Sequence, residues 1–456
     1  MEKRGFYFNT DNNSYYYDDI KGSVYCLENN SSEDIIYDNK IYEKKIIDTK
    51  KVEENIKNMD STQLTLIVTE ECNLRCKYCI FSGNYDNSRT HCSNFMDFSI
   101  AKEAITKYLN KSKTSRKRNL IFVPKLGFYG GEPLLNFTLI KKSVEYAESI
   151  YNGKINYTIT TNATLLNDDM IDFFVSKNFL FVVSLNGDKN ENDRLRVYRD
   201  GKGTFDDIFL KLNQINQKYP DFYKNNVKFS VTYDNGTDMF ALKDFFENNE
   251  LVKGKLAVLS KVSNLHANWY DQYSDEQNSI YNDQIKTLKE EFLRKLKTNE
   301  PIDLFSKKLF SIHYFLTLNR FINLDLKKVK PPIQPFSGSC IPTNKILVDY
   351  KGLLHMCEKV NATIPYGDVY KWIDYEKISN IINRYNNFLG KTCINCPIQR
   401  LCKLCYNDLI NSEGNFELDT QKICPMLIKQ EIKNLTDIYS ILESGITTIE
   451  LKNNLI

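Results

Sequence analysis

The sequence lacks the features that would point to a membrane or to a nucleic acid. No apolar run approaches the ~20 residues that a membrane-spanning helix requires, and residues 1–6 carry no apolar stretch of the signal-peptide kind. The net charge is only +3 over 456 residues, so no basic field favours nucleic-acid binding. We therefore expect a cytoplasmic protein that has neither a membrane nor a nucleic acid as its partner.

Cysteine, in contrast, is abundant, with 12 residues in the chain. In a reducing compartment, cysteines at short regular spacings indicate metal or cluster ligands rather than disulfides. The length predicts about two or three domains, since one domain usually takes ~100–200 residues. Apolar residues make up 42% of the chain, which is ample for a packed core.

The first cysteine group is the C-x3-C-x2-C run of Cys72, Cys76 and Cys79. Three thiolates on one short loop can ligate three irons of a [4Fe–4S] cube and leave the fourth iron open. An open iron can chelate a small molecule that has an amine and a carboxylate group. A zinc knuckle or a set of buried free thiols is the alternative for such a loop.

With Tyr78 just before its last cysteine, this run resembles the signature of the radical SAM superfamily. The resemblance implies a [4Fe–4S] cluster whose open iron binds S-adenosylmethionine (SAM). It also implies cleavage of SAM to a 5′-deoxyadenosyl radical that abstracts hydrogen from a substrate. In such enzymes the cofactors carry the hard step, while the protein orients the substrate and excludes water.

A second motif, Gly130-Gly131-Glu132-Pro133, ends a strand-like run. A glycine pair at a strand end lets the backbone approach another group closely, and the carboxylate of Glu132 could hold an ammonium. The resemblance implies that this G-G-E-P run binds the methionine amino group of SAM. A plain turn is the alternative.

Two later blocks resemble those of radical SAM peptide and protein maturases. Residues 157–166 match a T-N-G-T-L block, with Ala163 in place of its glycine. Residues 181–205 match an S-L-D-G…D-x-x-R…G-x-G-[ST]-F block, with Asn186 in place of its aspartate. The Asn186 change weakens any role for that position as an acid or a base.

The resemblance implies SAM contacts from a set of polar side chains in these motifs. The residues are Tyr78, Asn162, Ser184 and Arg196, together with Gly130 to Pro133. Ser184 could instead cap the next element, and Arg196 could form a surface ion pair. We assign no catalytic residue beyond the cluster ligands.

Strand-like and helical runs alternate from Gln63 to about Asn264. This alternation predicts a parallel sheet in an α/β fold, with sites at the carboxyl ends of its strands. All the motifs above follow strand-like runs. The resemblance implies a partial (β/α)6 TIM-type barrel, and we place this radical SAM core at residues 61–265.

A second cysteine group begins just after a stiff, proline-rich link at residues 331–335. Its spacing is C-x11-G-x4-C, a gap, C-x2-C-x5-C-x2-C, a gap, and a final C. The residues are Cys340, Cys357, Cys393, Cys396, Cys402, Cys405 and Cys424. The pattern resembles the SPASM domain, a C-terminal extension of radical SAM maturases that holds two auxiliary [4Fe–4S] clusters, although x3 is commoner than x2 before Cys405.

A zinc ribbon is the alternative for this group, but seven cysteines do not divide into two four-thiolate zinc sites. The resemblance implies three [4Fe–4S] clusters in all. The distal auxiliary cluster would be ligated by Cys393, Cys396, Cys402 and Cys424. The proximal one would be ligated by Cys340, Cys357 and Cys405, unless Cys26 or Cys92 supplies a fourth ligand. An open iron there could bind a substrate thiolate, lower its pKa and accept an electron as a C–S bond forms.

The remaining segments carry weaker signals. We predict a small N-terminal α+β segment at 1–60, either leader-peptide-binding or barrel-capping, and a helical bridge at 266–335. The SPASM domain would occupy 336–430, and a helix or tail 431–456.

The leading hypothesis is a maturase of ribosomally made, post-translationally modified peptides (RiPPs), of the thioether-forming sactipeptide or ranthipeptide type. Its partners would be a Cys-rich precursor peptide and an electron donor such as flavodoxin or ferredoxin. The alternatives are an anaerobic sulfatase-maturing enzyme that makes formylglycine, a maturase that forms C–C crosslinks, and a zinc-stabilised, non-enzymatic peptide-binding scaffold. The resemblance implies that sulfatase maturation uses an acidic general base.

Overall fold

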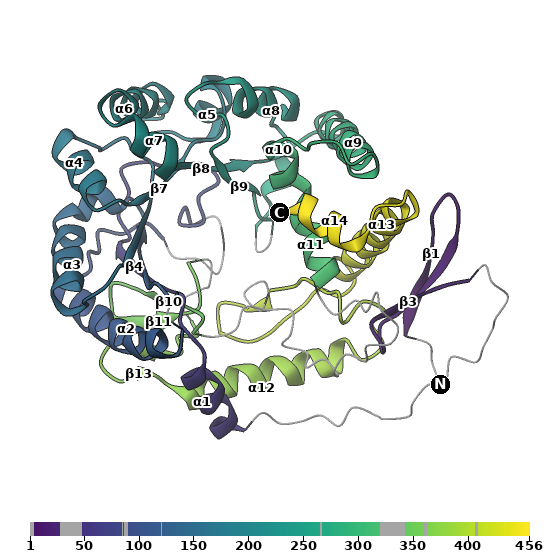
Figure 1. The fold of residues 1–456 in the computed structure, drawn as a ribbon, viewed down its shortest axis with the longest axis horizontal. Coiled ribbons are helices and arrows are strands. Elements are labelled where there is room, and N and C mark those ends of the chain that lie inside the picture. The colour runs from purple at the N-terminus through teal and green to yellow at the C-terminus, as the bar shows by residue number, and fades with distance from the viewer. Residues whose placement is uncertain are drawn as a thin grey trace.

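The structure is a computed structural model. It describes residues 4–27, 48–83, 85, 90–119, 121–264, 267–319, 343–358, 363–405 and 409–456. An outer layer of helices surrounds a curved ten-stranded sheet, and a small three-stranded sheet lies at the far side of the molecule (Figure 1).

Six parallel strands form the centre of the large sheet and are hydrogen-bonded in chain order. They are β4 (Gln63–Thr69), β5 (Lys125–Gly130), β6 (Asn156–Thr161), β7 (Leu180–Ser184), β8 (Val227–Tyr233) and β9 (Leu256–Lys261). Parallel neighbours need crossover connections, which are usually helical. The predicted partial (β/α)6 barrel is confirmed.

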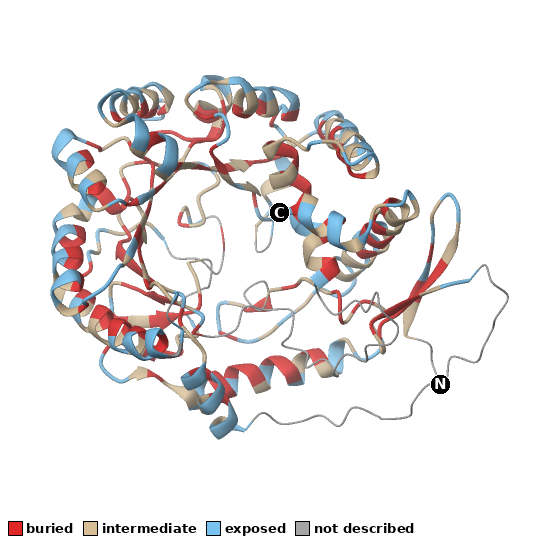
Figure 2. Ribbon diagram, viewed as in Figure 1, coloured by how far each residue is buried: buried red, intermediate tan, exposed pale blue. Residues whose placement is uncertain are grey.

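Helices cover the outside of this barrel. They are α2 (Phe98–Arg118), α3 (Phe137–Ile150), α4 (Asp168–Ser176), α5 (Lys189–Leu195), α6 (Phe205–Lys218), α7 (Pro220–Asn226), α8 (Met239–Asn248) and α9 (Asp275–Lys297). Their buried faces turn toward the strands (Figure 2). Asp97 caps α2 by accepting the N–H of Ser99, so this helix begins directly after Asp97 and runs to Arg118.

The sheet continues from the barrel into the cysteine-rich segment. Strand β10 (Lys345–Val348) pairs in parallel with β4, and β11 (Leu353–His355), β12 (Gly367–Asp368) and β13 (Trp372–Ile373) follow antiparallel. Gly352 turns the chain between β10 and β11 with φ +84°, a conformation that L side chains rarely adopt. This turn accounts for the glycine in the C-x11-G-x4-C spacing.

Other helices join the two parts. They are α1 (Thr49–Asn58), α10 (Leu304–Ser306), α11 (Ile312–Asn319), α12 (Tyr375–Thr392), α13 (Ile423–Glu443) and α14 (Thr448–Leu455), with short η1 (Pro133–Asn136), η2 (Trp269–Gln272) and η3 (Lys307–Ser311). Helix α1 packs on α12, and α11 on α13. Across the described ranges, no helix combines the length and apolarity that crossing a bilayer would require.

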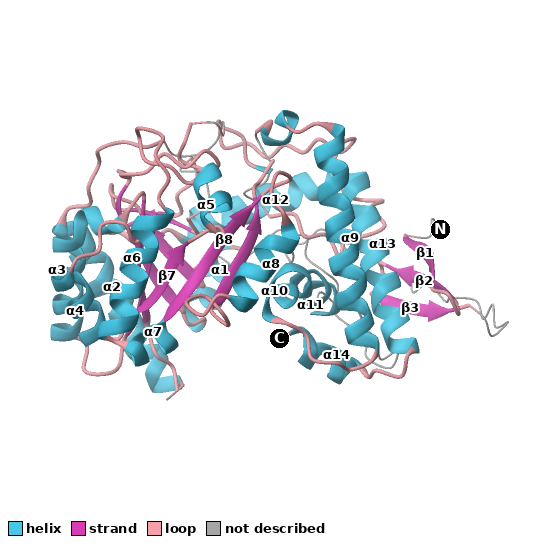
Figure 3. Ribbon diagram, turned by 90° about the horizontal axis from the view of Figure 1, so that it is seen from above, coloured by secondary structure: helices cyan, strands magenta, loops and turns pink. Residues whose placement is uncertain are grey.

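The N-terminal sheet consists of β1 (Gly5–Asn9), β2 (Ser14–Asp18) and β3 (Ser23–Cys26), all antiparallel. It lies beside α13 (Figure 3). Phe6, Phe8, Tyr15 and Tyr17 share an apolar cluster there with Leu401 and Leu435. The N-terminal strands therefore contact the cysteine-rich unit.

Candidate radical SAM site and auxiliary thiol site

The cysteine triplet lies on the loop that follows β4, at the carboxyl edge of the sheet. Two backbone hydrogen bonds tie this loop to the segment at the end of α5, from Arg75 N–H to Val197 O (2.8 Å) and from Lys77 N–H to Leu195 O (2.9 Å). Parallel-barrel sites lie at this edge. The loop is thus fixed at the place where the other motifs end.

The three thiols are neighbours in a poorly solvated environment. Burial raises the pKa of Cys72 to about 12, with smaller contributions from Glu132 and from the other two cysteines of the triplet. Burial likewise raises the pKa of Cys79 to about 11. A bound metal centre inverts this preference, because coordinating thiols are deprotonated. Without a bound metal, the raised pKa values of Cys72 and Cys79 argue against a free thiolate nucleophile on this loop.

The glycine pair packs against the start of the cysteine loop. A Cβ at Gly130, where φ is +153°, would lie 2.2 Å from Thr69 O, and one at Gly131 would lie 2.2 Å from Glu71 O. Gly131 N–H donates to Thr69 O (2.9 Å). The close approach predicted for this pair is thus an approach to the cysteine loop.

Glu132 is buried between β5 and β6. Its carboxylate accepts hydrogen bonds from Thr161 Oγ1 (2.6 Å), Asn162 N–H (2.7 Å) and Leu134 N–H (3.1 Å). Burial raises the pKa of Glu132 although these donors oppose the shift. Asn162 Nδ2 also donates to Asn73 Oδ1 (2.9 Å), which joins this group to the cysteine loop. Pro133, also buried, begins η1.

Tyr78 and Arg196 meet at the end of β7. Arg196 Nη1 donates to Tyr78 Oη (2.7 Å), and Tyr78 Oη donates to Asn186 Oδ1 (3.3 Å). Arg196 is buried, so it forms no surface ion pair. Ser184 is the last residue of β7 and is half-buried; the cap of the next helix, α5, is Asp188.

Two buried donors in this group, Asn186 Nδ2 and Arg196 Nε, find no hydrogen-bond acceptor among the described residues. Buried donors are seldom left unpaired in folded proteins. They mark a place for an acceptor that a ligand brings, as the carboxylate and ribose oxygens of SAM would. The residues present therefore fit this cofactor.

The remaining motif residues stabilise the fold. Asp193 accepts the N–H groups of Thr204 and Phe205, each at 2.8 Å, and thereby holds the start of α6. A Cβ at Gly203 would lie 2.2 Å from the Asp193 carboxyl group. Ala163 has φ +63°, a conformation easier for the glycine that the resembling block carries there.

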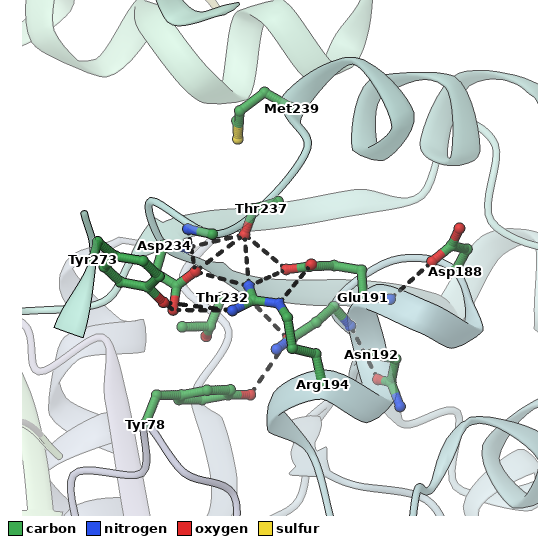
Figure 4. Close-up of polar contacts among 12 residues, drawn as sticks. Tyr78, Asp188, Glu191, Asn192, Arg194, Thr232, Asp234, Thr237, Met239 and Tyr273 are labelled. Atoms are coloured by element: carbon green, nitrogen blue, oxygen red, sulfur yellow. Dashed lines mark hydrogen bonds and ion pairs between the residues drawn. The ribbon is translucent and has the colours of Figure 1, made fainter. Parts of the chain in front are cut away.

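A network beyond β8 was missed by sequence reasoning (Figure 4). The Asp234 carboxylate accepts hydrogen bonds from Arg194 Nη2 (2.7 Å), Tyr273 Oη (2.5 Å) and Trp269 Nε1 (3.1 Å). Burial alone would raise the pKa of Asp234, but the bonds from Arg194 and Tyr273 outweigh it and lower the pKa. The Asp-Asn-Gly turn after a strand was the available signal. This carboxylate holds η2 on the barrel edge.

The second site is a cavity that four cysteines line together. They are Cys393, Cys396, Cys402 and Cys424, and the walls are apolar, with Leu389, Leu404 and Leu427. Burial raises the pKa of Cys393 to about 12, and the other three thiols add to the shift. The structure thus brings together the four residues that the sequence assigns to one cluster.

The described cysteines outside the triplet and the cavity lie in separate environments. Cys357 and Cys405 are half-buried, and Cys340 lies outside the described residues. Cys92 Sγ donates to Glu70 Oε2 (2.8 Å) beside the cysteine loop. Cys26 is exposed at the end of β3.

In the ranges that the structure describes, no three His, Cys, Asp or Glu side chains converge closely enough to hold one metal ion.

The barrel of six parallel strands and the three-cysteine loop at its carboxyl edge are the combination that characterises radical SAM proteins. The model of the radical SAM superfamily matches residues 66–238, and the chain contains a radical SAM domain over these residues. This is a domain of enzymes, and SAM and a [4Fe–4S] cluster are its cofactors. The predicted resemblance and the prediction of an enzyme are confirmed.

Several curated proteins are similar to this region. An uncharacterized protein of Methanocaldococcus jannaschii, MJ0907, is 39% identical over 170 residues, which cover 37% of this chain and 51% of that protein. A cysteine-type anaerobic sulfatase-maturating enzyme of Clostridium novyi is 28% identical over 152 residues, 33% of this chain and 38% of the enzyme. The chain thus spans about half or less of the length of these relatives.

Solved structures match over more of the chain. The enzyme anSMEcpe with bound AdoMet superposes with a TM-score of 0.57 at 18% identity, covering 86% of this chain and 97% of that one. The same enzyme with bound AdoMet and the Cp18Cys peptide gives a TM-score of 0.55 at 17% identity, covering 84% and 99%. This likeness shows the fold, including the C-terminal extension of the barrel.

Proposed function

We propose that this chain is a radical SAM peptide maturase that installs thioether crosslinks, from cysteine sulfur to carbon, in a ribosomally made Cys-rich precursor peptide. The observation that carries the proposal is the presence of two separate thiol sites. One lies at the carboxyl edge of the barrel and the other in the adjoining unit. An electron donor such as flavodoxin or ferredoxin would serve the reaction.

At the barrel edge, Cys72, Cys76 and Cys79 would hold the SAM-binding cluster. With SAM and this cluster bound, the site would supply a 5′-deoxyadenosyl radical that takes a hydrogen atom from the peptide. The chain's own part is to hold SAM. Tyr78, Glu132, Asn162, Ser184 and Arg196 would do so, with the unpaired Arg196 Nε and Asn186 Nδ2 as donors.

In the adjoining unit, Cys393, Cys396, Cys402 and Cys424 would complete the distal auxiliary cluster. Cys340, Cys357 and Cys405 would hold the proximal one with three protein ligands. A vacant iron position is what a substrate thiolate needs, which favours C–S bond formation. We keep residues 61–265 as the radical SAM core, 266–335 as the bridge, 336–430 as the SPASM domain, 431–456 as the C-terminal segment and 1–60 as a leader-binding or capping element.

Peptide substrates are supported by the names of the similar proteins. Several relatives are sulfatase-maturating enzymes, and anSMEcpe has been solved with a peptide bound. The same names favour a second candidate function, which is formylglycine formation on a sulfatase.

The barrel carboxylates argue against that second candidate. The resemblance implies an acidic general base for sulfatase maturation. Asp234, which follows β8, accepts hydrogen bonds from Arg194 and Tyr273 and is thereby engaged within the chain itself. Glu132, which follows β5, is assigned here to SAM. Asn186 replaces the aspartate of the family block.

Product mass tests the proposal. The protein is purified without oxygen and incubated with SAM, a reductant and a Cys-rich peptide encoded beside its gene. We expect the peptide to lose the mass of two hydrogens per crosslink. The crosslinked cysteines should no longer react with a thiol-alkylating reagent. An aldehyde product captured by a hydrazide would support formylglycine formation instead, and an unchanged peptide mass would contradict both.

A further inference from the structure

A buried charge pair lies beside the four-thiol cavity. Lys403 follows Cys402, and its Nζ lies 2.6 Å from Glu431 Oε1. The two side chains are 15% and 4% exposed, so little water screens their charges.

The pair belongs to a saturated hydrogen-bond network. Lys403 Nζ also donates to His313 O (3.0 Å) and to Thr317 Oγ1 (3.0 Å). Thr317 Oγ1 in turn donates to Glu431 Oε2 (2.9 Å). Asn434 Nδ2 donates to Glu431 Oε1 (3.3 Å). The network joins the Cys402 loop to α11 and α13.

Both ends of this network adjoin cavity cysteines. Lys403 stands between Cys402 and Cys405, the short stretch where the distal and proximal ligand sets meet. Glu431 lies on α13, the helix whose second residue is Cys424. Glu431 is the seventh residue after Cys424, which places the two on one face of the helix. The pair therefore connects the backbone of one cavity cysteine to that of another.

We propose that Lys403 and Glu431 are a positioning pair for the four-thiol site: together they fix Cys402 against Cys424 and balance the charge beside the cluster that these thiols hold. The inference rests on the proposed function, because it requires a cluster in the cavity. The pair takes no electron and no proton itself. A cluster held by Cys393, Cys396, Cys402 and Cys424 would take one electron from the external donor, and the fixed charges of Lys403 and Glu431 would set how readily it does so.

Opposite single substitutions distinguish this role from a merely structural one. K403M leaves the negative charge of Glu431, which disfavours the added electron, so the reduction potential becomes more negative. E431Q leaves the positive charge of Lys403, so the potential becomes more positive. K403M/E431Q and K403R return it toward the unaltered value. Loss of structure alone would not produce shifts of opposite sign.

A matched control pair joins α9 to α13, the helix that carries Glu431. Lys289 Nζ pairs with Asp437 Oδ2 at 2.6 Å, and both side chains are 13% exposed. The cavity cysteines are not part of that pair. K289M and D437N are expected to lower thermal stability but to leave the potential unchanged.

The experiment is a redox titration of the reconstituted full chain, followed by electron paramagnetic resonance. Signals of the auxiliary clusters are recognised because added SAM does not change them. Shifts in opposite directions for K403M and E431Q would support the pair. Shifts in the same direction, or shifts no larger than those of K289M, would overturn it.

If K403M fails to fold, the proposal can still be tested with E431Q. E431Q keeps the Lys403 bonds to His313 O and Thr317 Oγ1, so it carries the comparison alone: a more positive potential supports the pair, and an unchanged or more negative one overturns it. Iron analysis of the unaltered protein separates the two proposals. Without iron in the cavity the proposed function fails, whereas iron with insensitive potentials defeats only the pair.

Discussion

The two thiol sites of this protein are built in different ways. The triplet is local, since Cys72, Cys76 and Cys79 stand on one loop that two backbone hydrogen bonds anchor. The cavity is assembled from cysteines of a loop and of α13. A local site depends on its strand and loop, whereas an assembled site depends on every element that keeps its parts in register.

The N-terminal strands are one of those elements. Arg400, between two cavity cysteines, is buried, and its backbone N–H donates to Asp19 Oδ1 (2.8 Å). Its guanidinium donates to Asp19 O (2.5 Å) and Ile20 O (2.6 Å). Damage to β2 and the turn after it should therefore reach the cavity and spare the triplet.

The largest difference is expected from removing the thiols themselves. C72A/C76A/C79A should abolish SAM cleavage completely, because the radical-generating cluster loses all its ligands. C393A/C396A should leave SAM cleavage measurable and stop only peptide modification. Chromatography of 5′-deoxyadenosine is the measurement. Equal loss in both variants would show that the sites are not independent.

Next comes the contact between the N-terminal strands and the cavity loop. R400M removes the guanidinium that donates to the backbone carbonyls of Asp19 and Ile20. Each buried carbonyl left unpaired should cost about 1–3 kcal/mol. Chemical denaturation measures the loss. Iron at the cavity should fall while SAM binding to the triplet site persists; a loss of SAM binding would contradict the comparison.

Asp19 also makes the assembled site sensitive to pH. Burial raises the pKa of Asp19 to about 6, although Arg4 and Arg400 oppose the shift. The folded state therefore holds this proton more tightly than the unfolded state. As pH rises from about 4 to about 6, ionisation of Asp19 should remove about 3 kcal/mol of stability.

Denaturation curves of the unaltered protein and of D19N across this pH range test that sign. The stability gap between the two should change in favour of D19N as pH rises. A gap that stays constant, or that moves the other way, would refute the raised pKa.

A smaller effect is expected inside the SAM site. E132Q replaces one carboxylate oxygen by an amide donor, which would face the Asn162 N–H or the Thr161 hydroxyl. Weakening this group should reduce SAM affinity about 10-fold, or about 1.4 kcal/mol. Calorimetry on the reconstituted protein measures it. E148Q, on the exposed side of α3, is the control and should bind SAM normally.

The smallest effect belongs to Cys26. Its side chain is exposed at the end of β3. C26S should leave iron content and crosslinking unchanged and alter stability by less than about 0.5 kcal/mol. A loss of iron in C26S would instead make Cys26 a ligand of the proximal set.

Sequence reasoning succeeded where a pattern is local. The strand-helix alternation predicted the parallel sheet. The resemblance carried by the C-x3-C-x2-C run and by Gly130 to Pro133 predicted the barrel and the radical SAM domain.

Sequence reasoning missed the features that only tertiary contacts create. Nothing in the short strand at Lys345–Val348 indicates that it would extend the barrel sheet beside β4. Asp234 gave only a turn signal, because its partners Arg194 and Tyr273 are far away in the chain. The Lys403–Glu431 pair is likewise invisible before α11 and α13 meet.

Iron and acid-labile sulfide per chain, measured after anaerobic reconstitution, test the central claim most directly. We expect about twelve irons in the unaltered protein, about eight in C72A/C76A/C79A and about eight in C393A/C396A, since each cube holds four irons. Zinc in place of iron, or the loss of all iron from either variant, would contradict an enzyme with separate radical-generating and auxiliary clusters.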